Sequence, residues 1–137
     1  MEDSILKEKG WKPIPLSLKI LFVVFILWSI GSVMGISARY ESGLPFFGVW
    51  VTGIVAGLIV LILDIAAPIT FLFALWKRLS WGSTFALFYI AIFILNSIVV
   101  FFIFREQLGL TQILIPTIAN IVFFAVIYKE RRYFKRN

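Results

Sequence analysis

A single ionisable side chain interrupts the longest apolar segment of this 137-residue chain. Asp64 lies within residues 48–76, GVWVTGIVAGLIVLILDIAAPITFLFALW, where no other side chain is charged. A carboxyl group inside an apolar, membrane-spanning helix is costly, and such residues usually mark a functional site or a packing contact. Asp64 is therefore the first candidate for chemistry, because it could hold a proton or a cation, or donate a hydrogen bond to another helix.

Other polar groups are expected at a similar depth. Pro68 follows Asp64 by four residues, and because proline has no N–H, we expect a kink at which the carbonyl of Asp64 loses its helical partner. The helical rise puts Asp64 about 20 Å, Asn96 about 24 Å and Asn120 about 14 Å from the span ends that we expect to face the cytoplasm. The sequence thus allows a cluster of Asp64, Asn96 and Asn120 inside the bilayer.

A second proline is expected to act in the same way near the outer end of the last span. Pro116 predicts a kink and frees the carbonyl of Gln112, which lies beside Thr111. These groups together predict a small polar mouth on the outer side.

The cluster around Asp64 has two interpretations. It could be a proton- or ion-responsive site, supported by Asn96 and Asn120. Alternatively, Asp64 stays protonated in dry surroundings and donates an interhelical hydrogen bond, a contact worth about 0.6 kcal/mol on average. The two interpretations differ in whether water reaches the carboxyl group.

Four long apolar segments must position these residues. They cover about residues 16–36, 48–76, 81–104 and 110–128, and each is long enough to cross a bilayer as a helix. The chain is 61% hydrophobic and 15% charged, against about 45–50% and about 25% in ordinary globular domains. The connections are too short to hold a second domain. We therefore predict an all-α, four-helix transmembrane bundle that forms one domain over residues 1–137.

The basic residues indicate the orientation. All but two of the 13 Lys and Arg residues, Arg39 and Arg105, lie at one set of span ends. Positive residues accumulate on the cytoplasmic side, so we expect both termini in the cytoplasm. The basic tail could simply enforce this topology, or it could bind anionic lipids. No nucleic-acid partner is expected, because these residues lie beside membrane spans. The candidates for contact with lipid headgroups are Lys77, Arg78, Arg131, Arg132, Lys135 and Arg136.

Two pairs of glycines predict where helices approach closely. Gly31 and Gly35 lie late in the first span, and Gly53 and Gly57 lie early in the second. Because the two helices run in opposite directions, both pairs fall in the outer half of the bilayer. Glycines spaced by four form a flat groove on a helix, so we expect the first two spans to pack there. A homodimer interface would use the same motif.

The composition excludes most catalytic chemistry. The chain contains no cysteine and no histidine, which removes disulfides, thiolate metal sites and the commonest general base. It also lacks the phosphate-binding, serine-hydrolase and zinc-protease motifs. We therefore expect no enzymatic activity, no cofactor and no metal site.

One turn resembles a motif of a known family. Residues 74–82, ALWKRLSWG, are similar to the GLW-basic-x-x-W turn of small uncharacterised prokaryotic proteins with four transmembrane helices. WKPIP at 11–15 and YKERRYFK at 128–135 resemble that family's lead-in and basic, aromatic C-terminus. Alanine stands at position 74 in place of the usual glycine. The resemblance implies the four-span architecture but no chemistry, because the family carries no assigned function.

These observations lead to two hypotheses of function. The first is a non-enzymatic accessory or structural subunit, which packs against itself or another membrane protein through its glycine faces. The alternative is a small oligomeric transporter or channel, in which Asp64 couples movement to protons or cations. A lipid or hydrophobic small molecule bound between the helices is a third option.

Overall fold

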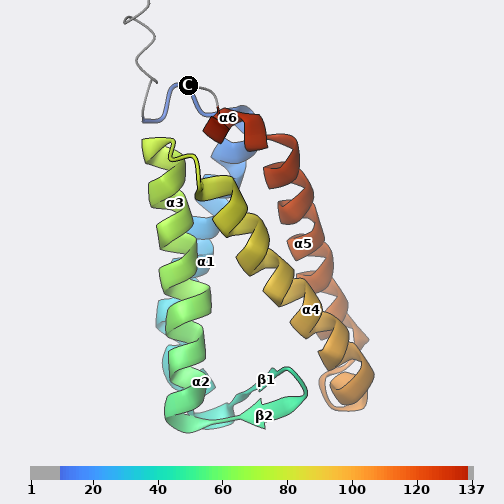
Figure 1. The fold of residues 1–137 in the computed structure, drawn as a ribbon. Coiled ribbons are helices and arrows are strands. Elements are labelled where there is room, and N and C mark those ends of the chain that lie inside the picture. The colour runs from blue at the N-terminus through green and yellow to red at the C-terminus, as the bar shows by residue number, and fades with distance from the viewer. Residues whose placement is uncertain (1–9, 136–137) are drawn as a thin grey trace, which may run out of the picture.

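Four helical segments, each long and apolar enough to cross a membrane, make up most of the structure. The computed structural model describes residues 10–135, and it confirms the predicted all-α, four-span bundle (Figure 1). The second segment is one helix in three parts, with a π-helical turn, η2, in the middle. The elements of the four segments are α1 (Leu16–Ser42), α2 (Gly53–Ile59), η2 (Val60–Ala66), α3 (Ala67–Lys77), α4 (Gly82–Leu108) and α5 (Leu110–Lys129).

The first helix is longer than predicted. It was expected to end near residue 36, where the sequence turns polar, but α1 continues to Ser42. Polar residues do not end a helix by themselves, and residues 37–42 contain neither proline nor glycine. The helix ends instead at Gly43, whose φ of 79° is readily adopted only by glycine.

A β-hairpin replaces the predicted start of the second span at residue 48. Strands β1 (Leu44–Phe46) and β2 (Val49–Val51) pair antiparallel, and the helix begins only at Gly53. Phe47 and Gly48 form the turn, with φ values of 45° and 85°. Positive φ at both central residues is the geometry of tight hairpin turns, which usually contain Asn-Gly. A phenylalanine there is unusual, and this is why the hairpin escaped prediction.

The bundle is tightly packed at one end and open at the other. In Figure 1, α3 and α4 lie close together near the C-terminus and separate toward the hairpin. We call these the terminal end and the hairpin end. α4 packs chiefly against α5, and α1 packs against α2, η2 and α3. The main core lies toward the terminal end and includes Leu18, Phe25, Phe71, Leu75, Ile90, Ile127 and Phe134.

The short helix α6 (Arg131–Lys135) fastens the terminal end. Arg78 ends α3 in a left-handed conformation, and its Nε donates a hydrogen bond of 2.7 Å to the carbonyl of Tyr133. Burial raises the pKa of Tyr133, while the positive charge of Arg78 opposes this effect. The Tyr133 hydroxyl donates to the carbonyl of Leu75 over 3.4 Å. Gly82 has no room for a side chain, because an added Cβ would lie 2.9 Å from atoms of Ala74 and Phe134.

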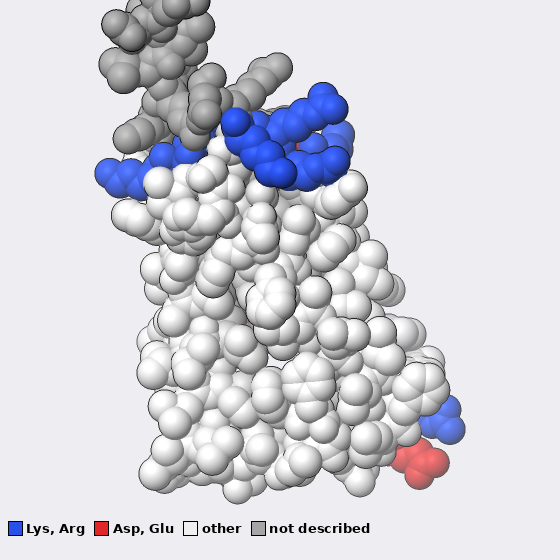
Figure 2. Space-filling model, viewed as in Figure 1, with Lys and Arg blue, Asp and Glu red and all other residues white. Residues whose placement is uncertain are grey.

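On the face that Figure 2 shows, charged side chains lie only at the two ends of the molecule. Figure 2 shows Lys and Arg side chains gathered at the terminal end, and a broad uncharged band between the ends. Lys77, Arg132 and Lys135 are exposed there, and Arg131 donates a hydrogen bond to the carbonyl of Tyr128 over 3.0 Å. Arg136 lies outside the described residues. The uncharged band has the arrangement expected of a surface that faces lipid.

Candidate functional site

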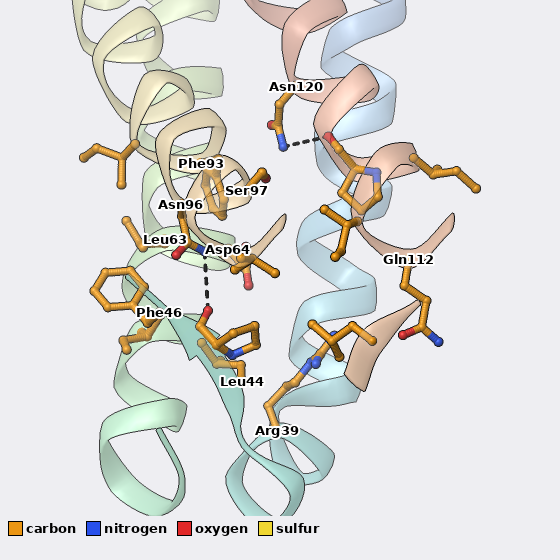
Figure 3. Close-up of a pocket in the computed structure, with 18 of the residues that line it drawn as sticks. Arg39, Leu44, Phe46, Leu63, Asp64, Phe93, Asn96, Ser97, Gln112 and Asn120 are labelled. Carbon is orange, nitrogen blue, oxygen red and sulfur yellow. Dashed lines mark hydrogen bonds between the residues drawn. The ribbon is translucent and has the colours of Figure 1, made fainter. Parts of the chain in front are cut away.

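A cavity of about 700 Å³ occupies the space between the separated helices. α1, the second helical segment, α4 and α5 form its walls, and β1 contributes Leu44, Pro45 and Phe46 to its lining (Figure 3). Its volume lies in the range of about 300–1,000 Å³ that is usual for small-molecule sites. The lining is mainly apolar, with a few polar side chains, and the cavity is open rather than enclosed.

All three polar residues that the sequence singled out line this cavity. Asp64 reaches it from η2, Asn96 from α4 and Asn120 from α5. No hydrogen bond joins any two of them, although all three lie in the described part of the chain. They therefore share a cavity without forming the bonded cluster that their depths allowed. Their role in binding an ion or ligand stays a prediction.

Asp64 is the least satisfied of the three. Its Oδ1 atom is buried and has no hydrogen-bond partner among residues 10–135. The side chain of Trp28 lies within hydrogen-bonding reach of the carboxyl group, and the positive charge of Arg39 acts on it through space. A buried oxygen without a partner costs free energy. The site therefore favours a proton, a cation or another donor at Asp64.

The local helix geometry differs from the expected break at Pro68. Asp64 lies in η2, where bonds run between residues five apart, and the Ala67 N–H accordingly donates to the carbonyl of Ile62. In this register the missing N–H of Pro68 would face the carbonyl of Leu63 rather than that of Asp64. Isolated π-helical turns often lie at functional sites. Asp64 thus lies within such a turn, between Val60 and Ala66.

Asn96 is bonded to the hairpin. Its Oδ1 accepts a hydrogen bond of 2.7 Å from the N–H of Phe47, and its Nδ2 donates to the carbonyl of Pro45 over 3.4 Å. The tip of the hairpin also abuts α4, since a Cβ added at Gly48 would lie 2.9 Å from Ile103 Cδ1. A residue that the sequence nominated for ligand binding therefore also holds the hairpin over the cavity.

Asn120 and Pro116 lie together on α5. The Asn120 Nδ2 donates to the carbonyl of Pro116 over 2.9 Å, so this amide bonds within its own helix. Both residues also border a second void of about 30 Å³, a volume that suits one or two water molecules. Thr111 and Gln112, predicted to form a polar mouth, line the main cavity as well.

Aromatic side chains close the bundle on the terminal side of these voids. The ring of Phe25 lies 5.6 Å from that of Phe71, 5.2 Å from that of Phe123 and 6.4 Å from that of Tyr89. Phe71 and Phe25 are 0% and 4% exposed. Tightly packed aromatic rings therefore separate the cavity from the terminal end.

The structure does not pack the glycines as predicted. α1 does contact α2, but a Cβ added at Gly31, Gly35 or Gly53 would have no neighbour within 4 Å, and one at Gly57 would meet only Tyr40 at 3.7 Å. Gly53 has a φ of 65° and begins α2, so its role is conformational. Within residues 10–135, only Gly57 of the four glycines therefore lies against a residue of the other helix, Tyr40 of α1. Gly31 and Gly35 border a separate surface cavity of about 440 Å³.

Sequence reasoning treated Arg39 only as an indicator of topology. The structure adds it to the site, because Arg39 and Trp28 line both the main cavity and the surface cavity beside Asp64. The two residues are separated by three helical turns and so share a face of α1. The sequence did not indicate Arg39 as a site residue, because the helix was expected to end before it.

The comparisons with known proteins add nothing to this geometry. Neither protein-family models, nor curated proteins, nor solved structures gave a match to the chain. Residues 10–135 contain no group of three acidic residues arranged to hold a metal ion. What can be inferred about function therefore rests on the cavity and its polar groups.

Proposed function

We propose that this integral membrane protein binds a small molecule with a cationic group in its cavity, as the binding step of a proton- or cation-coupled transporter. One observation carries the proposal: in the described part of the chain, Asp64 is the one acid among the residues that line the open cavity of about 700 Å³, and it keeps a carboxyl oxygen, Oδ1, without a hydrogen-bond partner. An acid that served only to fasten helices would have both carboxyl oxygens bonded to neighbouring helices, whereas within residues 10–135 only Trp28 of α1 reaches the Asp64 carboxyl group and Oδ1 has no partner. A coupling acid must instead be reachable by its ligand.

The proposed orientation makes the cavity face the outside. With both termini in the cytoplasm, as the positive residues at the terminal end favour, the hairpin and Arg39 lie on the outer side. The aromatic contacts around Phe25 then form the inner barrier. The arrangement supports an outward-facing state of a transporter better than a continuous channel.

Infrared difference spectroscopy of the carboxyl group tests the proposal. The protein in lipid bilayers is titrated with acid and then with sodium or tetramethylammonium ions, and the Asp64→Asn variant identifies the Asp64 band. Glu106→Gln, which removes an exposed acid, is the matched control. We expect the Asp64 band to respond to pH and to at least one cation. A band that stays fully protonated and ignores every cation would contradict the proposal.

A second candidate function rests on the open glycine face of α1. Because a Cβ added at Gly31 or Gly35 would meet no other part of residues 10–135 within 4 Å, this face is free to pack against another membrane helix. A second copy of the chain or another subunit would then use it, as in the accessory-subunit hypothesis. Energy transfer between labelled copies in bilayers tests this, with Gly31→Leu expected to abolish the signal and Gly109→Ala expected to leave it unchanged.

A further inference from the structure

Two opposite charges share the main cavity without forming an ion pair. Arg39 reaches it from the last turns of α1, and Asp64 reaches it from η2. Figure 3 shows both side chains directed into the space between their helices. No side-chain nitrogen of Arg39 lies within 4.0 Å of a carboxyl oxygen of Asp64, although the charge of Arg39 still acts on that carboxyl group.

Such a pair selects strongly for the charge of a ligand. Arg39 would weaken the binding of a simple cation at Asp64, and Asp64 would weaken the binding of a simple anion at Arg39. Repulsion of this kind contributes to specificity as much as attraction does. A ligand that carries one charge of each sign would satisfy both residues at once.

The other lining residues indicate the chemistry of the part of the ligand that connects its two charged groups. Leu63, Phe93 and Val100 supply apolar surface, and Trp28 adds an aromatic ring beside Asp64. An ammonium group is attracted both to a carboxylate and to an aromatic face. An apolar body would be buried against the rest of the lining.

We propose that the ligand of this cavity is a zwitterion with an apolar body, whose ammonium group binds at Asp64 and whose carboxylate or phosphate binds at Arg39. This inference rests on the proposed function and specifies its substrate class. Two sources share the chemistry: a free hydrophobic amino acid, and the headgroup of a zwitterionic lipid.

Matched probes separate the contribution of each charge. Leucine carries both charged groups, 3-methylbutylamine is leucine without its carboxylate, and 4-methylpentanoate is leucine without its amine. Dodecylphosphocholine and dodecyltrimethylammonium form the corresponding lipid-like pair. Binding to the full chain in nanodiscs is measured by calorimetry for the wild type, Asp64→Asn and Arg39→Gln. Arg105→Gln is the control, because Arg105 is also exposed at the hairpin end but does not line the cavity.

We expect leucine or dodecylphosphocholine to bind at least about tenfold more tightly than its singly charged relatives, since each charge pair formed with the ligand contributes to affinity. Asp64→Asn and Arg39→Gln should each weaken that binding, Arg39→Lys should retain most of it, and Arg105→Gln should not change it. Arg39→Gln should also strengthen binding of the amine, because a repulsive charge is removed. Whichever zwitterion binds identifies the source.

Two negative results have different meanings. If an amine binds in an Asp64-dependent way and as tightly as its zwitterionic partner, and Arg39→Gln has no effect, the zwitterion proposal is overturned while the proposed function stands. If no probe binds in an Asp64-dependent way, both fail together. Arg39→Lys is the control for misfolding, because it changes the side chain at position 39 but retains its positive charge.

Discussion

Replacing Asn96 by alanine should release the hairpin from α4. The substitution removes the acceptor for the Phe47 N–H, a hydrogen bond of 2.7 Å, and the weaker bond of 3.4 Å to the carbonyl of Pro45. A hydrogen bond of this kind contributes about 1 kcal/mol net. Phe47 is also held at a φ of 45°, a conformation that costs a non-glycine residue about 1–3 kcal/mol. The free energy of local opening should therefore fall by about 1–2 kcal/mol.

Amide hydrogen exchange in bilayers measures this opening. A loss of about 1–2 kcal/mol corresponds to exchange that is about 5–30 times faster, and it should be confined to the strands Leu44–Phe46 and Val49–Val51. Asn120→Ala is the matched control, because that amide bonds within α5 and should leave the hairpin unaffected. Unchanged exchange in the Asn96→Ala hairpin would refute the assignment of Asn96 as its anchor.

Three further substitutions test the packing, each read from unfolding in lipid nanodiscs. Gly82→Ala should destabilise the bundle by about 1–3 kcal/mol, because the new Cβ would lie 2.9 Å from Ala74 and Phe134; an unchanged stability would show that this contact yields freely. Gly35→Ala should have the opposite sign and stabilise a monomer by about 0.5–1 kcal/mol, since it meets no neighbour and removes a glycine from a helix interior. A loss of stability there would mean that the face is occupied. Phe25→Ala should cost about 3–5 kcal/mol, because its ring contacts those of Phe71 and Phe123, and a smaller cost would show that these aromatic residues do not close the bundle.

The spans could be predicted from the sequence because of a strong physical constraint. Within a bilayer every backbone polar group must be satisfied locally, so long apolar segments such as Gly82–Leu108 can only be helices. The hairpin obeys no such rule. Its strands are three residues each. Its turn depends on positive φ values at Phe47 and Gly48, which could not be predicted from this pair of residue types.

The depth of each polar residue along its helix could be predicted from the sequence. The direction in which its side chain points around the helix axis could not. The rise per residue put Asp64, Asn96 and Asn120 at interior levels, and they do line one cavity. Which partner each amide would find depends on helix rotation and on the hairpin, so the bond from Asn96 to the hairpin could not be foreseen. The first two spans do pack on each other, as predicted, but Gly31, Gly35 and Gly53 have open space beside them, because spacing gives a flat face on a helix and does not say which helix, if any, covers it.

The central claim is that Asp64 lies in a cavity reached by water from the outer side, and cysteine labelling tests it most directly. The chain has no cysteine, so Asp64→Cys introduces the only thiol. Intact cells are treated from outside with a membrane-impermeant maleimide, with Glu106→Cys as the exposed control and Ala86→Cys, at a position that is 0% exposed, as the buried one. We predict labelling of the thiols at positions 64 and 106 but not at 86. A thiol at position 64 that stays unlabelled while position 106 reacts would contradict the account.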